Sequence, residues 1–212
     1  MRGKFISLEG GEGAGKTTNL RLIETYLKNK NIDLIITREP GGTPLAEKIR
    51  NLLLEKNINN ISNNNPEKFS EETELLLMFA ARAQHLSHLI LPALDAGKWV
   101  ICSRFTDSTY AYQGGGRGVS FEKIRILEKL VQGDLQPDIS FYFDLPVEIG
   151  LARAKARGEL DRIEQEQQDF FERVRAVYLD RAKNYSRFHI INANQSIEKV
   201  AMDLENILEK FL

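Results

Sequence analysis

Short runs of β-branched and aromatic residues recur along the chain, separated by longer segments in which apolar residues follow a helical period. Four runs are prominent and a fifth is weaker; they are residues 4–10, 32–39, 98–105 and 138–146, with 187–193 as the weaker run. Apolar residues that continue without alternation over this length are typical of strands buried on both faces, as in a parallel sheet. The pattern therefore predicts five strands of one parallel sheet.

Helical spacing and helix start signals fill the intervening segments. Thr43 before Pro44 predicts a helix start, since threonine caps helices and proline is favoured at the first helical position. A long helix is expected over about 71–91, ending near Pro92, and the last helix gathers apolar residues on one face over 197–211. Alternating strands and helices predict an α/β fold, with a doubly wound sheet whose ligands bind at the carboxyl ends of the strands.

Composition sets limits on domain number and partners. The chain has 212 residues, so we expect a single domain over 1–212. Its net charge of −1 gives no global field that would draw it to nucleic acid or to an anionic membrane. Cys102 is the sole cysteine, which excludes an internal disulfide and favours a reducing compartment. The start lacks a signal-peptide core and no apolar run approaches the roughly 18 residues of a membrane span, so we expect a cytoplasmic protein.

One stretch has the sequence of a phosphate-binding loop. Residues 10–17 are GGEGAGKT, which matches the pattern G-x-x-x-x-G-K-[ST]. Glycines let backbone N–H groups point inward around an anion, Lys16 adds positive charge, and the Thr17 hydroxyl can bind Mg²⁺. A predicted strand precedes the loop and a helix follows, so we expect a bound nucleoside triphosphate with Mg²⁺. The expected contacts are Gly10, Gly11, Gly13, Ala14, Gly15, Lys16, Thr17 and Thr18.

The loop leaves the phosphoryl acceptor open, because switch GTPases, motor ATPases and small-molecule kinases all carry it. Three further segments combine arginines with polar side chains near the ends of predicted strands; they are 37–50, 74–85 and 103–118. Planar guanidinium groups suit phosphate and carbonyl oxygens. Several arginines at strand ends near one phosphate loop favour an acceptor site over isolated surface ion pairs.

The order of these motifs resembles a known family. EGGEGAGKTT, TREPGGT, LLLMFAARAQH, AYQGGGRG and KARGELDRIE follow one another as they do in thymidylate kinases of the bacterial type. The resemblance covers nearly the whole chain, with the Asn-rich residues 57–66, which we expect to form a flexible surface loop, as the main exception. It implies a P-loop NTPase fold that transfers the γ-phosphoryl group of ATP to dTMP, giving dTDP, with Mg²⁺ as cofactor. It also implies a homodimer formed through helices that flank the sheet.

The resemblance further implies roles for individual residues. Three arginines would surround the dTMP phosphate: Arg50 and Arg104 in contact with it and Arg38 beside it. Four side chains would meet the base: Arg82, Thr109, Gln113 and Met78. Glu39 would help hold Mg²⁺ through water, together with Thr17.

Glu12 is a carboxylate inside an anion-binding loop that has no basic residue before Lys16. The resemblance implies that Glu12 faces the acceptor, accepts a hydrogen bond from the deoxyribose 3′-hydroxyl and pairs with the phosphate-binding arginines. The alternative is a carboxylate turned to solvent.

Positive charge for the transferred phosphoryl group has to come from elsewhere, because the loop offers only Lys16. Residues 150–164 carry Arg153 and Arg157, whose separation of four places them on one helical face. The segment resembles the lid of bacterial thymidylate kinases, which supplies a catalytic arginine. We therefore expect Arg157 to act in catalysis, with Arg153 in support, beside Lys16, Glu12 and Arg104. The alternative is a basic, solvated helix.

Several positions depart from the family pattern or leave a choice open. Ser103 stands where the family usually has Asp, and a hydroxyl is a weaker metal partner than a carboxylate. Met78 stands where the family often has a Phe that stacks on thymine, with Phe79 next, so the sequence leaves open which side chain touches the base. His85 and His88 are three apart on the expected helix, and we assign them to a helix surface or interface rather than to a metal.

Two other functions stay open from the sequence. One is a kinase for another deoxynucleotide on the same scaffold. The other is a nucleotide-binding protein that has lost catalysis, for which Ser103 is the only indication.

Overall fold

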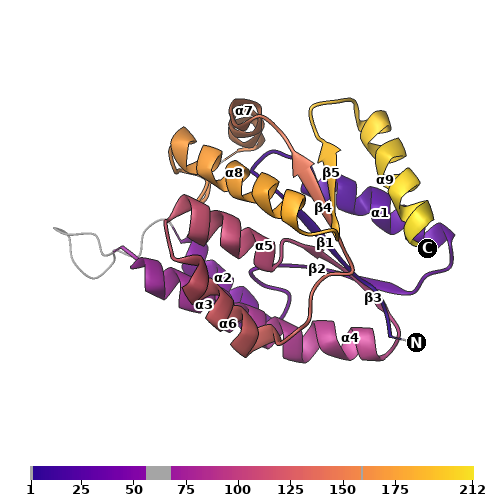
Figure 1. The fold of residues 1–212 in the computed structure, drawn as a ribbon, viewed down its shortest axis with the longest axis horizontal. Coiled ribbons are helices and arrows are strands. Elements are labelled where there is room, and N and C mark those ends of the chain that lie inside the picture. Colours follow the sequence, from indigo (N-terminus) through magenta and orange to yellow (C-terminus); the bar gives the residue numbers. More distant parts are fainter. Residues whose placement is uncertain (1, 56–67, 159) are drawn as a thin grey trace.

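The protein is described by a computed structural model over residues 2–55, 68–158 and 160–212 (Figure 1). The Asn-rich residues 57–66 lie outside the described residues. Within the described residues one parallel sheet has the order β2-β3-β1-β4-β5, which confirms the predicted set of strands. Their bounds are β1 Phe5–Gly10, β2 Leu34–Arg38, β3 Trp99–Ser103, β4 Ile139–Asp144 and β5 Phe188–Asn192.

Helices cover both faces of this sheet. They are α1 Lys16–Asn29, α2 Pro44–Leu54, α3 Glu71–His85, α4 Leu91–Asp95, α5 Thr106–Thr109, α6 Phe121–Gln132, α7 Val147–Arg157, α8 Gln168–Asn184 and α9 Ile197–Phe211, with two π-helical segments, η1 Leu86–Ile90 and η2 Tyr110–Gly116. Helices α1 and α9 lie on one face, as Figure 1 shows, and α3, α4, α8 and η2 lie on the other. The predicted doubly wound α/β architecture is therefore confirmed.

The three inner strands, β1, β3 and β4, are buried on both faces because their side chains alternate between apolar cores, whereas the edge strands β2 and β5 are partly exposed. Ile6 and Leu8 of β1 point to the core under α1 and α9, while Phe5 points to the core under η1 and α4. Cys102 of β3 lies fully buried in the second core, as expected for a small core residue. No helix of the described residues has the length and apolarity that a membrane span requires.

Local sequence signals set the helix starts, and one predicted helix end is wrong. Thr43 Oγ1 accepts a hydrogen bond from Ala46 N at 3.3 Å, with Pro44 at the first helical position, as predicted. Pro92, by contrast, does not end the helical path, which runs from α3 through η1 into α4. Pro92 lies at the start of α4, directly after the π-helical segment, where the wider helical turn accommodates the proline ring.

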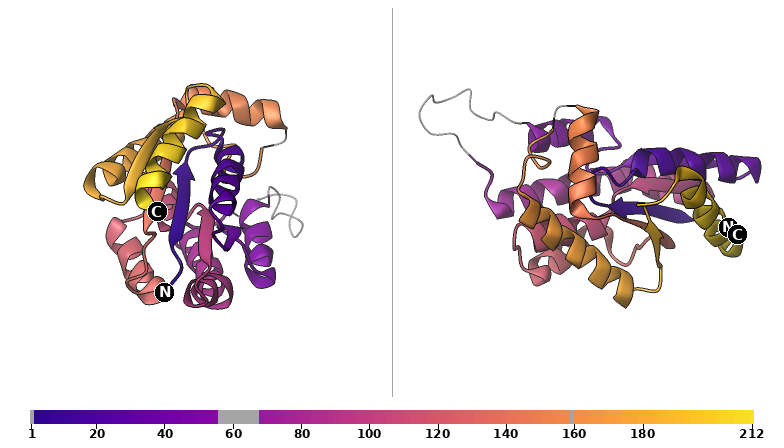
Figure 2. Two further views of the ribbon diagram at one scale, coloured as in Figure 1. Left: turned by 90° about the vertical axis from the view of Figure 1, so that its right-hand side faces the viewer. Right: turned by 90° about the horizontal axis from the view of Figure 1, so that it is seen from above.

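The register of the strands brings their carboxyl ends to one edge of the sheet. Leu8 of β1 pairs with Ser103 of β3, and Gly10 pairs with Phe143 of β4. The loops after β1 and β3 consequently begin side by side. In Figure 2 (right) the arrow of β1 also points toward α7, which places the predicted lid helix at this same edge.

Candidate active site

A cavity of about 520 Å³ opens at the carboxyl edge of the sheet. It is formed by the loops after β1, β2 and β3, by α3 and η2, and by α7 with the segment that follows it. The predicted site residues that line it are Glu12, Gly13, Ala14, Gly15, Lys16, Thr17, Thr18, Glu39, Arg50, Met78, Arg82, Arg104, Thr109, Gln113, Arg153 and Arg157. Gly10, Gly11 and Arg38 do not line it.

The phosphate loop between β1 and α1 curves around one end of this cavity. Gly13 and Gly15 have left-handed backbone, with φ of 66° and 78°, which glycine adopts at low cost. Gly13 also lies against α7, since a Cβ on it would come within 2.2 Å of the Gly150 carbonyl oxygen. Helix α1 has no side chain capping its N-terminus, so its first N–H groups are available to an anion.

Lys16 is folded back onto the loop. Its Nζ donates to the carbonyl oxygens of Gly10 and Gly11 at 3.0 and 2.7 Å. Burial lowers the pKa of Lys16 to about 7, and the nearby Arg104 guanidinium acts in the same direction, while Glu12 opposes the shift. A bound polyphosphate would stabilise the charged form and restore the ordinary pKa.

Glu12 faces the cavity interior and not solvent, with only 13% of its side chain exposed. Its Oε1 accepts from Arg104 Nη2 at 2.5 Å and from the Tyr112 hydroxyl at 2.7 Å. Burial alone would raise the pKa of Glu12, but Arg104 and Lys16 outweigh it and lower the value to about 2. The carboxylate in the phosphate loop is thus ionised and directed away from the loop's own backbone cradle.

Arg104 is held in an unusual conformation at the end of β3. Its φ of 70° lies in the left-handed region, where a side chain other than glycine is strained. Two hydrogen bonds from backbone N–H groups hold this strained conformation. Arg104 N donates to Leu8 O at 2.9 Å, and Phe105 N donates to the Glu9 side chain at Oε1, also at 2.9 Å. The guanidinium group then lies 4.7 Å from the centre of the Tyr112 ring and donates to Gly10 O at 2.9 Å. Arg104 is therefore positioned before any ligand binds.

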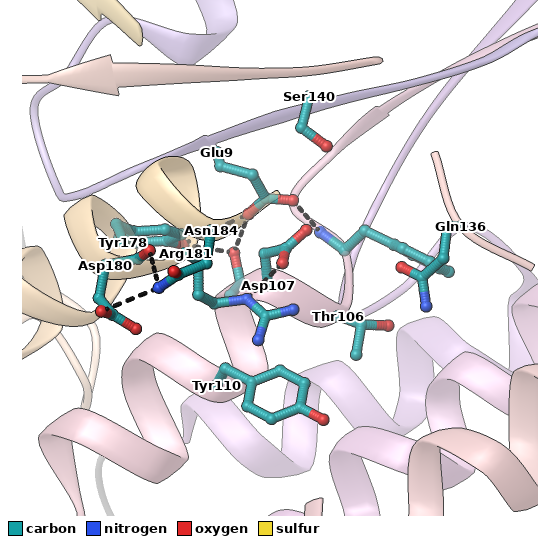
Figure 3. A network of polar contacts seen from close by, with 12 residues as sticks. Glu9, Thr106, Asp107, Tyr110, Gln136, Ser140, Tyr178, Asp180, Arg181 and Asn184 are labelled. Atoms are coloured by element: carbon teal, nitrogen blue, oxygen red, sulfur yellow. Dashed lines mark hydrogen bonds and ion pairs between the residues drawn. The ribbon is translucent and has the colours of Figure 1, made fainter. Parts of the chain in front are cut away.

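A buried network of polar side chains holds the turn at Arg104 in place (Figure 3). Glu9 Oε2 accepts from the Ser108 hydroxyl at 2.6 Å, and Ser108 is also within 2.7 Å of the Tyr178 hydroxyl. Asp107, next in the chain, accepts from Arg181 Nε at 2.5 Å. Burial and the neighbouring Asp107 raise the pKa of Glu9, while Ser108 opposes the shift. These side chains link the end of β1, the start of α5 and α8, and so fix the loop that carries Arg104.

The far end of the cavity is built around Arg82 of α3, which is only 3% exposed. Its Nε donates to Glu39 Oε2 at 2.7 Å and its Nη2 to Thr109 Oγ1 at 2.9 Å. Its Nη1 has no partner among the described residues. Arg82 lines the cavity, and an unpaired buried donor costs about 1–3 kcal/mol, so this guanidinium group has capacity for one more acceptor.

His85 completes this group and does not lie on the helix surface, so that prediction was wrong. It is fully buried, with Nδ1 within 3.0 Å of Glu39 Oε1 and Nε2 within 2.6 Å of Thr37 Oγ1. It follows Arg82 by three residues, so both side chains leave the same face of α3. The three-residue spacing from Arg82 is the feature of the sequence that could have predicted this position of His85. His88, by contrast, is exposed, as predicted.

Arg38 and Arg50 behave differently although both were expected near the acceptor phosphate. Arg50 lines the cavity and donates from Nη1 to Pro40 O at 2.8 Å. Arg38 is exposed and pairs with Glu47 at 3.0 Å, so in this structure it lies outside the cavity. Strand alternation explains the difference from the prediction: Thr37 and Glu39 point inward, and Arg38 between them points outward.

The two candidates for base contact are separated clearly. Met78 lines the cavity, whereas Phe79 is 2% exposed in the core formed with Leu75 and Tyr110. The Arg82 guanidinium lies 4.8 Å from the centre of the Phe79 ring, so Phe79 supports Arg82 from the core side.

The two predicted lid arginines lie on α7 and reach the cavity. Both Arg153 and Arg157 line it, and Arg157 is ion-paired with Glu164 in the segment after α7. The Arg157 side chain is 61% exposed, so it is much less constrained than Arg82. Arg162, in the same segment, donates to Glu74 Oε2 at 2.6 Å and to Leu53 O at 2.9 Å, which ties the segment to α3 and α2.

A metal would have to be held with few protein ligands. Among the described residues, no three or more His, Cys, Asp or Glu side chains are grouped to bind a metal ion. Mg²⁺ that accompanies a nucleotide needs no such group, since it keeps several waters and uses phosphate oxygens with one or two protein oxygens. Thr17 lines the cavity, and Glu39 keeps lone pairs for water although Arg82 and His85 already contact its two oxygens.

The parallel sheet, the phosphate loop between β1 and α1, and a second arginine-lined end of one cavity define a P-loop phosphotransferase class. A family model described as Thymidylate kinase matches residues 8–204. The chain belongs to the thymidylate kinase family. The chain is 55% identical to a thymidylate kinase of Pseudomonas putida, over 100% of this chain and 98% of the relative. It is 55% identical to that of Teredinibacter turnerae, over 100% of both.

A solved structure is similar over the same extent. The crystal structure of thymidylate kinase from Ehrlichia chaffeensis has a TM-score of 0.76 and 34% sequence identity, and the match covers 98% of this chain and 99% of that one. Fold and sequence therefore agree on the family.

Proposed function

We propose that this chain transfers the γ-phosphoryl group of ATP to dTMP, giving ADP and dTDP, a step toward dTTP. One observation supports this reading above the others: Arg82, fixed by Glu39 and Thr109, lines the same cavity as the phosphate loop. A guanidinium donor suits a thymine carbonyl oxygen, since it can only donate. Family membership over residues 8–204 supports the same activity.

On the donor side, the loop N–H groups and the start of α1 would bind the ATP phosphates, with Lys16 at the β and γ phosphates. Mg²⁺ would be held by Thr17 and, through water, by Glu39; bound there, it neutralises developing charge on the phosphates. We expect Lys16 to leave the carbonyl oxygens of Gly10 and Gly11 when it meets a phosphate.

On the acceptor side, Arg50 and Arg104 would bind the dTMP phosphate, and Glu12 would accept from the 3′-hydroxyl. Arg104 is already oriented by Glu12, Tyr112 and the backbone of Gly10. Arg38, paired with Glu47, would reach the phosphate only if that pair opened. Thr109, Gln113 and Met78 would complete the pocket for the base.

Catalysis would consist of positioning and charge stabilisation. The oxygen of a phosphate monoester is an adequate nucleophile, so no general base is required. Arg157, supported by Arg153, would leave Glu164 and stabilise charge on the transferred group. The segment 150–164 would thereby act as a lid and exclude water from the reacting groups.

We also propose a homodimer, a single domain over 1–212 and a cytoplasmic location. Helices α3 and α6 pack beside each other (Figure 1) and expose large apolar side chains: Leu76 is 55% exposed, Ile126 56% and Leu130 77%. Exposed apolar side chains on neighbouring helices favour association with a second copy. Sedimentation at several concentrations tests the dimer, and a monomer at all of them would reject it.

A coupled assay of ADP formation with ATP, Mg²⁺ and dTMP tests the proposed reaction. We expect kcat/KM to be highest for dTMP among dTMP, dUMP, dCMP and thymidine. A higher value for another acceptor would favour a kinase for that nucleotide. ATP binding without dTDP formation would instead indicate a nucleotide-binding protein without catalysis.

A further inference from the structure

The amide of Gln113, expected at the base, is held by a carboxylate that does not itself line the cavity. Gln113 Nε2 donates to Glu74 Oε1 at 3.0 Å, and the two residues are only 2% and 3% exposed. Glu74 belongs to the first turn of α3, where Glu71 and Glu72 are both exposed. A buried carboxylate at this position calls for an explanation, because burial of a charge is costly unless it is paired.

Two arginines from other segments pair with Glu74. Arg117 Nε donates to Oε1 at 3.3 Å, and Arg162 Nη2 donates to Oε2 at 2.6 Å. Burial alone would raise the pKa of Glu74, but Arg117, the Gln113 bond and Arg162 outweigh it and keep the pKa below its ordinary value. Glu74 is therefore an ionised carboxylate, which accepts hydrogen bonds and donates none.

An ionised carboxylate fixes which end of a neighbouring amide faces it. The reversed Gln113 amide would place its carbonyl oxygen against the carboxylate, and two acceptors repel each other. The NH₂ group must then point to Glu74, which leaves the Gln113 carbonyl oxygen as the acceptor available to a ligand. Thymine carries N–H at ring position 3, where cytosine has a bare acceptor nitrogen.

We propose that Glu74 is a positioning residue that makes Gln113 select a pyrimidine with N–H at position 3, so that dTMP is preferred to dCMP. This role rests on the proposed function, since it assumes that the base binds beside Gln113. Arg82 adds a separate preference, because it can donate to the O4 carbonyl of thymine and not to the amino group of cytosine. Loss of the Glu74 charge should lower the ratio of kcat/KM for dTMP to that for dCMP, and dTMP should remain the preferred substrate.

The test is the ratio of kcat/KM for dTMP to that for dCMP in Glu74→Gln. A glutamine at 74 accepts or donates, so the Gln113 amide can turn to meet cytosine. We expect the ratio to fall at least about tenfold, which corresponds to about 1.4 kcal/mol. A role in stability alone would lower both activities together and leave the ratio unchanged.

Glu72→Gln and Arg162→Gln are the matched controls. Glu72 lies two residues before Glu74, is exposed and pairs with Lys123. Its substitution removes the same charge from the same helix. Arg162→Gln removes the ion pair that ties the segment after α7 to Glu74, but it keeps the Glu74 carboxylate and its pair with Arg117. Both controls should keep the wild-type ratio within about twofold, because neither removes the carboxylate that orients the Gln113 amide.

Glu74→Gln removes the shared carboxylate of two partly buried arginines, so this variant is at risk of poor folding. The paired variant Glu74→Gln/Arg162→Gln removes one charge of each sign, and its ratio of kcat/KM for dTMP to that for dCMP should fall as it does in Glu74→Gln. An unchanged ratio in a folded Glu74 variant overturns the proposal, as does an equal fall of the ratio in Arg162→Gln alone. If the wild-type protein forms no dTDP, the proposed function has failed and not this role of Glu74.

Discussion

The two halves of the cavity are constructed in different ways. The acceptor half, defined by Glu39, Arg82, Thr109 and Gln113 and supported by buried His85, consists of side chains at most 5% exposed, and all of them except Gln113 are linked to one another by hydrogen bonds. The donor half, defined by residues 13–18 with Arg153 and Arg157, consists of backbone, two exposed arginines and a lysine that binds its own loop. Under the proposed function, recognition of the acceptor would thus be built into the core, while the donor half would rearrange around its ligand.

This difference predicts that substitutions in the two halves fail in different ways. Removing a buried partner in the acceptor half should cost both stability and activity, because the remaining polar groups stay buried and unpaired. Removing an exposed arginine in the donor half should cost activity alone, because exposed ion pairs contribute at most about 1 kcal/mol to stability.

The largest effect is expected in the donor half from Arg157→Ala. Without its charge on the transferred phosphoryl group, kcat should fall about 10³-fold, the lower end for an arginine supplied to phosphoryl transfer. Binding of dTMP and the melting temperature should stay close to wild type. Steady-state kinetics and a thermal melt measure both.

Lys155→Ala is the control for this prediction. Lys155 is exposed on the same helix and does not line the cavity, so its loss removes the same charge with kcat nearly unchanged. An Arg157→Ala protein that keeps its kcat would show that the lid arginine plays no part in catalysis.

In the acceptor half, Arg82→Gln should lower kcat/KM for dTMP about 10²-fold and also destabilise the protein. Glu39 would lose its closest partner while 5% exposed, and breaking a buried pair costs about 3–5 kcal/mol. Urea denaturation would measure the loss of stability. A variant with wild-type stability would contradict the idea that the acceptor half is part of the core.

The sequence predicts most of the fold because the relevant signals are local. Each strand is marked by a continuous apolar run, and the start of α2 by Thr43 and Pro44. The continuation of the helix past Pro92 was missed, because a π-helical segment that accommodates a proline leaves no local pattern. Local signals therefore fix which elements exist, and less surely where they end.

The site was predicted less completely because some partners meet only in the folded chain. His85 was assigned to a surface since its partners, Thr37 and Glu39, lie 48 and 46 positions earlier. Glu74 gave no signal for the same reason, because its partners lie in two distant segments, Gln113 and Arg117 in one and Arg162 in the other. Arg38 was expected near the ligand by resemblance, and strand alternation turns it outward.

His85 therefore offers a sharper test of the buried half than any residue that touches a ligand. In His85→Ala, Thr37 and Glu39 each lose a buried hydrogen-bond partner, so the free energy of unfolding should fall by about 2–4 kcal/mol. The KM for dTMP should rise several-fold, because Glu39 no longer holds Arg82 as firmly. Chemical denaturation of His85→Ala and His88→Ala gives the comparison, and exposed His88 should change stability by less than about 0.5 kcal/mol. Equal effects at the two positions would refute the buried role of His85.

The smallest expected effect concerns protons taken up in the donor half. With the pKa of Lys16 lowered to about 7 in the free protein, most Lys16 is neutral at pH 8, and bound polyphosphate should return its pKa toward 10.5. Binding of Mg·ATP at pH 8 should then take up about 0.9 proton, and affinity should weaken as pH rises above 7. Calorimetry in buffers of different ionisation enthalpy measures the uptake, which Lys16→Met should abolish and Lys155→Met should preserve. Binding without proton uptake would mean that Lys16 is already charged in the free protein, so that the donor half needs less rearrangement than its structure indicates.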